Sequence, residues 1–206
     1  MKRVAILGGT FNPVHIGHLM LAQSVLDHGA AEKVVFMPSN LPPHKSHDEL
    51  ASAADRLAML HLAVDDNPAF EISLQEIERG GISYAYDTIA DWMEKNPGPS
   101  PVFIIGMDTL RELHTWVRIG DLLPLCEFVA LRRPGTDPEM GPTDIRLPSP
   151  WPERLLSRVI PGRNCEVSST EIRERVASGR EIRYLTPDAV IRYIAANDLY
   201  CIGAHH

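Results

Sequence analysis

The sequence contains few cysteines, and they are not arranged as a structural framework would be. The 206 residues include only Cys126, Cys165 and Cys201, and no two of them form a CxxC pair or another metal-ligand spacing. An odd number of widely separated cysteines argues against a disulfide scaffold and against a zinc site built from thiolates. We therefore expect three reduced thiols in a cytoplasmic protein.

Long hydrophobic runs are also missing. The apolar stretch after Lys2-Arg3 stops at Gly8, which is too short for a signal peptide, and no later stretch could span a bilayer. The formal net charge of −7 disfavours nucleic acid or an anionic membrane as a general partner. A nucleotide substrate is still compatible with that charge, because local donors and bound Mg²⁺ can outweigh a distant negative field. The terminal pair His205-His206 is typical of a purification tag and is assigned no function.

The remaining composition is that of a globular protein, with 44% apolar and 23% charged residues, and the length suits one domain over residues 1–206. Apolar runs of strand length alternate with helical patterns. The expected strands are Val4–Leu7, Val34–Met37, Val102–Ile105 and Phe128–Leu131, and the expected helices are Leu19–Leu26, Leu50–Val64 and Tyr86–Met93. This alternation predicts an α/β fold, a doubly wound parallel sheet whose ligands bind beyond the carboxyl ends of the strands.

The amino-acid composition changes after the fourth expected strand. Residues 134–152 hold six prolines and few aliphatic residues, which predicts an exposed connection. A small, more helical C-terminal part over residues 153–203 should follow. In it, Thr186-Pro187-Asp188 predicts a helix start with the threonine as N-cap and the proline at the first helical position.

The most informative segment runs from Gly8 to His18, with the sequence GGTFNPVHIGH, between an expected strand and an expected helix. Two glycines let backbone N–H groups face a ligand, and the positive end of the following helix suits phosphate. His15 and His18 lie three apart, so they can point the same way and add donors or positive charge. This pattern predicts a polyphosphate site.

Other interpretations of this segment are weaker. A histidine pair at this spacing also occurs in zinc sites, but no third ligand stands at a useful spacing nearby; ordinary core or surface histidines are the other alternative. The dinucleotide pattern GxGxxG and the Walker pattern GxxxxGK[ST] are both absent.

A second cluster, Ser168-Ser169-Thr170-Glu171-Ile172-Arg173, has the composition of a helix start. Ser169 or Thr170 would be the N-cap, with acidic residues in the first turn. Hydroxyl groups at a helix start, together with an arginine on its first turn, also make an anion site. Two such helix ends in one chain suit a triphosphate held from both sides.

Together, GGTFNPVHIGH and SSTEIR resemble the HxGH nucleotidyltransferase superfamily, which transfers adenylyl or cytidylyl groups. Within it the chain resembles the bacterial nicotinate mononucleotide adenylyltransferases along nearly its whole length. The matching segments are Pro38–Lys45, Ile82–Thr88, Phe103–Asp108 running on to Trp116, and Val167–Arg173. The resemblance implies a Rossmann-like nucleotidyltransferase fold, with ATP and nicotinate mononucleotide as substrates and Mg²⁺ carried with ATP rather than held at a dedicated metal site.

The resemblance also implies residue roles. The catalytic set would be His15, His18, Lys45 and Arg173. The ATP-binding set would be Gly8, Gly9, Thr10, Phe11, Gly106, Asp108, Ser168, Ser169 and Thr170. The set that binds the mononucleotide would be Asn40, Tyr84, Ala85 and Trp116. Taken from the residues alone, Asp108 could instead cap a helix starting at Thr109, Lys45 could be a solvated surface lysine, and Trp116 could simply pack.

Two positions depart from the family pattern. Asn12 stands where the family commonly has Asp, which removes a charge beside the phosphate loop but keeps a turn-forming side chain. Ala85 stands where the family usually has Thr, so recognition of the nicotinate carboxylate is kept only if it uses the backbone N–H.

Several rival functions stay open on the sequence alone. The same chemistry could act on nicotinamide mononucleotide, phosphopantetheine or a riboflavin phosphate. A nucleotide-sensing protein that binds without turnover is a rival from another functional class. The sequence leaves the oligomeric state open. A dehydrogenase is disfavoured because the dinucleotide fingerprint is absent.

Overall fold

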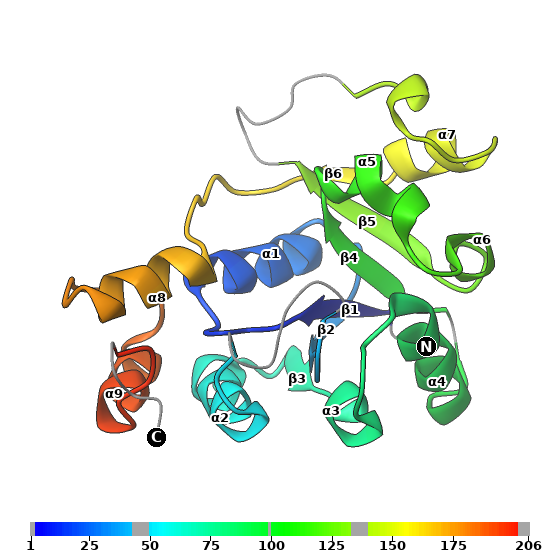
Figure 1. The fold of residues 1–206 in the computed structure, drawn as a ribbon. Coiled ribbons are helices and arrows are strands. Elements are labelled where there is room, and N and C mark those ends of the chain that lie inside the picture. The colour runs from blue at the N-terminus through cyan, green and yellow to red at the C-terminus, as the bar shows by residue number, and fades with distance from the viewer. Residues whose placement is uncertain (1–2, 43–49, 99, 133–139, 202–206) are drawn as a thin grey trace.

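The computed structural model describes residues 3–42, 50–98, 100–132 and 140–201. Its centre is a parallel sheet with the strand order β3-β2-β1-β4-β5-β6 (Figure 1). The strands are β1 (Val4–Gly9), β2 (Lys33–Pro38), β3 (Phe70–Ile72), β4 (Val102–Gly106), β5 (Glu127–Arg132) and β6 (Val159–Pro161). The chain moves outward in one direction from β1 to β3 and then in the other from β4 to β6, which is the doubly wound topology that the alternating pattern predicts.

Helices connect these strands. They are α1 (Ile16–Asp27), α2 (Ala53–Val64), α3 (Gln75–Arg79), α4 (Ala85–Lys95), α5 (Thr109–Glu112), α6 (Ile119–Leu122), α7 (Trp151–Leu156), α8 (Ser169–Ala177) and α9 (Asp188–Ala196), with 3₁₀ turns η2 (Leu113–Thr115) and η3 (Pro142–Asp144). None of the helices in the described ranges is long and apolar enough to cross a bilayer.

Two apolar clusters cover the two faces of the sheet. Alternate residues of a strand point to opposite faces, so Ala5 and Leu7 lie in one cluster while Ile6 lies in the other. The first cluster takes side chains from α1, α2, α8 and α9, and the second takes them from α4, α5, α6 and α7. Burial on both faces explains why the central strands are continuous apolar runs.

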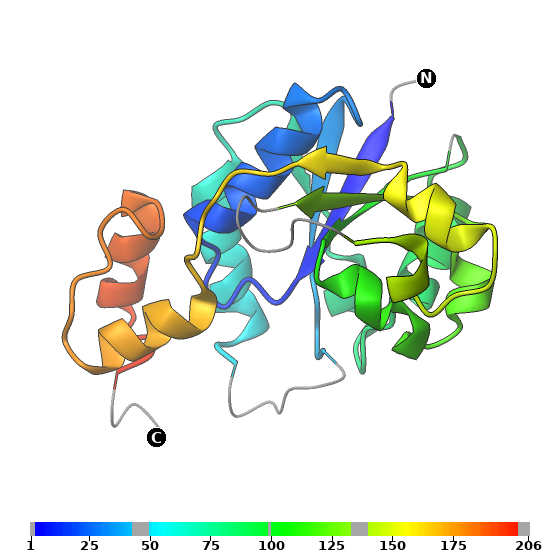
Figure 2. The same cartoon turned by 90° about the horizontal axis from the view of Figure 1, so that it is seen from above.

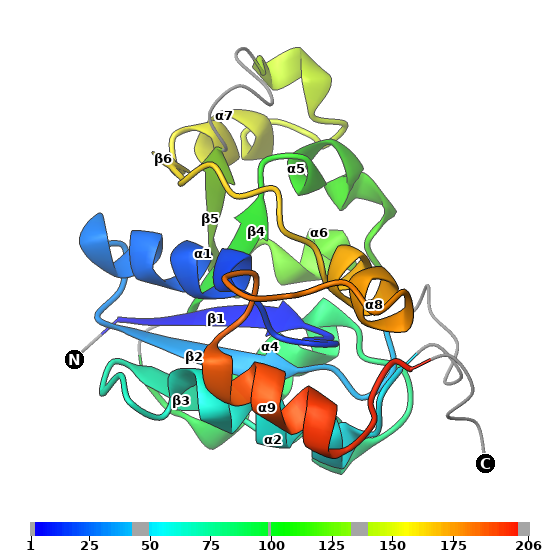
Figure 3. The ribbon, with the colours of Figure 1, turned by 90° about the vertical axis from the view of Figure 1, so that its left-hand side faces the viewer.

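The last two helices extend the molecule to one side. In Figure 2, α8 and α9 lie at one side and α7 at the other. Figure 3 shows α9 beside α2, against which it packs, and Tyr193 of α9 donates a hydrogen bond of 3.0 Å to Asp55 Oδ1 of α2. The C-terminal part is therefore joined to the same core, and β6 is a strand of the main sheet.

The structure confirms the predicted fold class and corrects details. The strands β3 and β6 were not predicted, because three residues are too few to show a pattern. Within the described part of the predicted exposed connection, Met140 and Ile145 are buried in the second cluster and Pro152 is buried in α7, so that prediction is wrong for those residues. Apolar side chains separated by prolines can still pack, one at a time, onto a neighbouring sheet.

Helix α9 also begins later than predicted. Its N-cap is Pro187, and the helix starts at Asp188. The hydroxyl of Thr186, predicted to cap this helix, instead donates a hydrogen bond of 2.8 Å to the carbonyl of Val14. That bond ties the C-terminal part to the loop that follows β1.

Candidate functional site

The predicted site residues begin at one edge of the sheet. In the parallel register, Gly9 at the end of β1 lies opposite Pro38 at the end of β2, and Gly106 ends β4 opposite Leu131 of β5. The carboxyl ends of the three strands thus form one edge, where ligands bind in this class of fold. Gly8 is exposed there, so its backbone is open to a ligand.

The loop after β1 folds back on itself through Phe11. This residue is fully buried and adopts a left-handed φ of 48°, which is uncommon for an aromatic residue. Its ring lies so close to Gly9 that a Cβ added there would stand 3.1 Å from it. The glycine at position 9 therefore leaves room for the Phe11 ring next to the end of the strand.

The two histidines form a stacked pair at the start of α1. Their ring centres are 3.7 Å apart, and the backbone N–H of His15 donates a hydrogen bond of 3.2 Å to His18 Nδ1. With Nδ1 acting as acceptor, the neutral imidazole of His18 carries its proton on Nε2, which can donate to a ligand. A Cβ at Gly17 would lie 2.9 Å from His15 Nδ1, so the glycine of HxGH makes room for the first histidine.

Both histidines are neutral at pH 7 in the free protein. Burial lowers the pKa of His15 to about 4. Burial, and secondarily the neighbouring His15, hold the pKa of His18 well below its usual value. Anionic phosphates favour the charged form of a neighbouring imidazole, so binding of a polyphosphate would raise the pKa of His15.

The C-terminal part fixes the carbonyl groups of this loop. Three successive carbonyls accept bonds from side chains more than 150 residues away: Asn12 from Arg173 at 2.9 Å, Pro13 from Ser169 at 2.8 Å and Val14 from Thr186 at 2.8 Å. The N–H of Ile16 adds a bond of 3.0 Å to the carbonyl of Leu185. The predicted cluster at the start of α8 therefore contacts the loop between β1 and α1, as a site that holds a triphosphate from both sides requires.

The start of α8 lies one residue earlier than predicted. Ser168 is the N-cap, because its backbone is extended and its hydroxyl accepts the N–H of Glu171 at 3.1 Å. The predicted caps have other partners: Ser169 donates to Pro13, and Thr170 accepts a bond of 3.3 Å from Arg173. The first N–H groups of α8 have no acceptor within the helix, which leaves them available to an anion.

A second group of predicted residues gathers beyond β2. The Asn40 side chain donates 3.0 Å to the carbonyl of Gly81, and its backbone N–H donates 3.2 Å to the hydroxyl of Ser83. This places Asn40 beside Tyr84, the N-cap of α4, and Ala85, the first residue of α4. The structure therefore brings together Asn40, Tyr84 and Ala85, which the sequence predicts to bind one substrate.

A buried carboxylate that the sequence analysis missed supports this segment. Glu76 accepts a bond of 2.5 Å from the hydroxyl of Thr88 and a further bond from Ser83. Burial raises its pKa, and these hydrogen bonds and the charge of Arg79 oppose the rise. Ser83 and Thr88, both in the segment that resembles the family, thus serve to hold the start of α4.

The remaining predicted residues lie on β4 or in the segment that follows it, with one exception. Gly106 ends that strand, and Asp108 is the N-cap of α5, without a side-chain cap bond. Trp116 packs edge-on against Phe103 of β4, with ring centres 5.9 Å apart, so it belongs to the second apolar cluster. The exception is Lys45, which lies outside the described residues.

Two buried polar side chains lie next to the loop that follows β1: Arg56, which the sequence did not point to, and Asn12, whose structural role the sequence did not show. Arg56 of α2 is 2% exposed and bonds only to backbone carbonyls among the hydrogen bonds in the described ranges. Asn12, the departure from the family pattern, is fully buried, and its Oδ1 accepts bonds from Tyr200 at 2.8 Å and from Ala51 at 3.0 Å. The amide oxygen therefore serves the fold, and burial raises the pKa of the Tyr200 hydroxyl.

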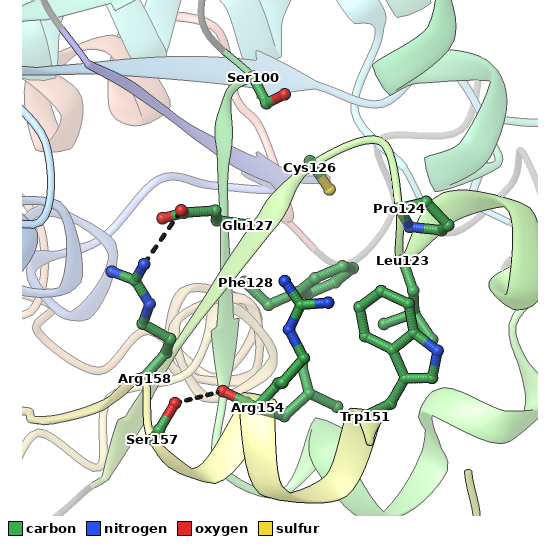
Figure 4. A pocket seen from close by; sticks show the side chains of 11 residues that line it. Ser100, Leu123, Pro124, Cys126, Glu127, Phe128, Trp151, Arg154, Ser157 and Arg158 are labelled. Atoms are coloured by element: carbon green, nitrogen blue, oxygen red, sulfur yellow. Dashed lines mark hydrogen bonds and ion pairs between the residues drawn. The ribbon is translucent and has the colours of Figure 1, made fainter. Parts of the chain in front are cut away.

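A cavity of about 580 Å³ lies elsewhere, at the amino end of β5 (Figure 4). It is lined by residues that include Cys126, Glu127, Trp151, Arg154 and Arg158. Glu127 begins β5, so this cavity is at the opposite edge of the sheet from Gly9 and Gly106. Among the described residues, none of those that the sequence predicts for the site lines it.

Comparisons with known proteins identify the family to which this chain belongs. The model of the cytidylyltransferase-like family matches residues 6–175, so the chain belongs to that family. It is 42% identical over 218 residues to the probable nicotinate-nucleotide adenylyltransferase of Symbiobacterium thermophilum, covering 100% of this chain and 99% of the relative. It is 40% identical over 200 residues to the nicotinate-nucleotide adenylyltransferase of Bacillus subtilis, covering 97% and 99%. Within the family, the chain is a member of the nicotinate-nucleotide adenylyltransferases.

Solved structures share the fold. Plasmodium falciparum nicotinic acid mononucleotide adenylyltransferase complexed with NaAD has a TM-score of 0.73 and 17% identity, over 97% of this chain and 98% of that one. The same enzyme complexed with APC has a TM-score of 0.72 and 16% identity over the same shares. At such low identity, these neighbours show the architecture alone.

Proposed function

We propose that this chain transfers the adenylyl group of Mg-ATP to nicotinate mononucleotide, forming nicotinate adenine dinucleotide and pyrophosphate in NAD biosynthesis. The observation that carries the proposal is the stacked pair of His15 and His18 at the start of α1, joined through the loop to the start of α8. Membership in the nicotinate-nucleotide adenylyltransferase family supports the choice of substrates. A cytoplasmic location stays a prediction of the sequence.

The reaction needs positioning and charge stabilisation rather than a general base. The attacking phosphate of the mononucleotide is already ionised near neutral pH, because its second pKa is about 6. The reacting α-phosphorus and the leaving pyrophosphate gather negative charge that oriented donors stabilise. We assign this role to His15, His18 and Arg173, with Lys45 included on the resemblance. Mg²⁺, entering as the Mg-ATP complex, would neutralise part of the triphosphate charge.

The histidines would act first as hydrogen-bond donors. His18 presents Nε2–H because its Nδ1 accepts the N–H of His15. The triphosphate would then raise the pKa of the His15 ring, so that a proton taken up there on binding adds positive charge beside the leaving group. The backbone N–H groups at Gly8, Gly9 and the start of α8 would complete the phosphate cradle, with Gly106 and Asp108 at the adenosine ribose.

The pyridine end of the acceptor would lie at the start of α4. The backbone N–H of Ala85 is in the first turn of that helix, where it has no intrahelical acceptor. It can therefore bind the nicotinate carboxylate without the hydroxyl that the family usually has at this position. Asn40 and Tyr84 lie beside it, and Trp116 would supply a flat face for the ring.

The direct test is pyrophosphate release from Mg-ATP with nicotinate mononucleotide, run in parallel with nicotinamide mononucleotide. A strong preference for the acid supports the proposal and the role of the Ala85 N–H. Comparable rates would make the enzyme dual-specific. ATP binding without release in the presence of either acceptor would contradict the proposal and favour another phosphate acceptor or a nucleotide-binding protein without turnover.

A further inference from the structure

The buried Arg56 connects the two halves of the proposed site. Its Nη1 donates 2.9 Å to the carbonyl of Thr10, in the loop after β1, and 2.7 Å to the carbonyl of Ser39, in the loop after β2. Its Nη2 donates 3.3 Å to the carbonyl of Asn40, and its Nε donates 3.2 Å to the carbonyl of Ala51. One guanidinium therefore bridges the loop proposed for ATP and the loop proposed for the acceptor.

Burying the charged guanidinium of Arg56 costs folding free energy, so its position calls for a functional explanation. Arg56 is 2% exposed, burial lowers its pKa, and its hydrogen bonds in the described ranges go to uncharged carbonyl oxygens. A buried charge is tolerated only when its hydrogen bonds are satisfied in good geometry. A large apolar side chain would fill a helix position facing the sheet equally well, as Leu60 does one turn later.

The bonds also set the direction of backbone N–H groups. In a trans peptide the N–H points opposite to the carbonyl of the preceding residue. With the carbonyls of Thr10 and Asn40 turned toward Arg56, the N–H groups of Phe11 and Leu41 point away from α2. Ala51 extends the linkage, because its own N–H donates 3.0 Å to Asn12 Oδ1 in the first loop.

We propose that Arg56 is a positioning residue for adenylyl transfer, which holds the ATP loop and the acceptor loop in mutual alignment. The inference rests on the proposed function. Its consequence is a separation of kinetic effects: each loop alone still binds its own substrate, but the α-phosphorus and the attacking oxygen lose their alignment. Misplacement of reacting groups by about 1 Å costs about 10²-fold in rate.

The test compares Arg56→Met and Arg56→Lys with Leu60→Ala, which removes a buried apolar side chain one turn later in the same helix. Dissociation constants for Mg-ATP and for nicotinate mononucleotide, each measured alone, are compared with kcat at a temperature at which every variant is folded. We expect Arg56→Met to lower kcat at least about 30-fold below Leu60→Ala, with each dissociation constant changed less than about threefold. Arg56→Lys, which keeps a cation within reach of some of the carbonyls, should recover part of that loss.

The outcomes separate the two proposals. If the wild-type chain releases no pyrophosphate, the proposed function fails, whatever the variants do. If it does release pyrophosphate and Arg56→Met has the kcat of Leu60→Ala, Arg56 is structural only and the inference is overturned. Should Arg56→Met not fold, Arg56→Lys decides: a kcat reduced about tenfold with unchanged dissociation constants supports positioning, and an unchanged kcat overturns it.

Discussion

The two edges of the sheet hold their polar groups in different ways. At the carboxyl edge, Arg56 and Asn12 are buried; Arg56 bonds to backbone carbonyls and Asn12 to the partly buried Tyr200. At the amino edge, Arg158 and Glu127 form an ion pair of 3.0 Å whose side chains stay nearly half exposed, and Arg154 lies over the Trp151 ring. Burying a polar group costs free energy unless its bonds are satisfied, whereas exposed pairs contribute little. The edge that we propose to be functional is therefore distinguished by buried polar groups with satisfied hydrogen bonds, whereas the cavity at the other edge is lined by half-exposed charges.

The largest expected effect is on the chemical step at the carboxyl edge. His18→Ala should lower kcat at least about 10²-fold, because one oriented, charge-stabilising donor is lost. The matched control is His61→Ala on α2, an exposed histidine paired with Asp65 at 3.0 Å, which should leave kcat within about twofold. Pyrophosphate release at saturating substrates measures both, and an unchanged kcat in His18→Ala would remove that residue from the mechanism.

The neutral histidines also predict a pH dependence of stability. The pKa of His15 is about 4 when folded and near 6.5 when unfolded, so the unfolded chain binds more protons between these values. Stability is then unaffected above pH 6.5, falls as the pH drops through this window, and has lost about 3 kcal/mol from this residue below pH 4.

Urea unfolding of the wild type and of His15→Gln over this pH range isolates the contribution of His15, since the carboxylates are common to both. The variant should lose less stability than the wild type between pH 6.5 and 4. Parallel curves for the two proteins would show that His15 does not titrate with a lowered pKa.

A smaller effect concerns acceptor choice. Ala85→Thr should change the ratio of kcat/KM for the acid and amide mononucleotides by less than about threefold, because recognition is assigned to the N–H at the start of α4. Steady-state kinetics with both acceptors measures the ratio. A rise of tenfold or more in preference for the acid would instead show that a hydroxyl is the missing recognition group.

The amino edge should show the smallest effect. Arg154→Ala, in the cavity of Figure 4, should leave kcat and both KM values within about twofold, because its guanidinium lies over the Trp151 ring at the amino edge of the sheet. Any large loss of activity with unchanged unfolding free energy would break the contrast between the two edges.

Residues with a local pattern could be predicted from the sequence. The continuous apolar runs predict four of the strands, and the segment from Gly8 to His18 predicts a strand end, a loop and a helix start that follow one another directly. The spacing of residues does not show why positions 9 and 17 are glycine. In the structure, a Cβ at Gly9 would crowd the Phe11 ring, and a Cβ at Gly17 would crowd the His15 ring.

Residues whose role depends on distant partners could not be predicted. Arg56 stands three and four residues before Met59 and Leu60, in the buried stripe of its helix, and a charge in that stripe was the available signal. The bonds of Ser169 and Thr186 to the phosphate loop join residues more than 150 positions apart, and no local pattern encodes them. The binding and catalytic roles assigned to all the site residues, among them Gly106, Asp108, Trp116 and Lys45, stay predictions.

The most direct measurement is a crystal structure of the protein with a non-hydrolysable ATP analogue, Mg²⁺ and nicotinate mononucleotide. The account predicts the triphosphate between the starts of α1 and α8, within hydrogen-bond distance of His18 Nε2 and Arg173, with the pyridine carboxylate at the start of α4. Nucleotide bound in the cavity beside Trp151 and Arg154, with the carboxyl edge empty, would contradict it.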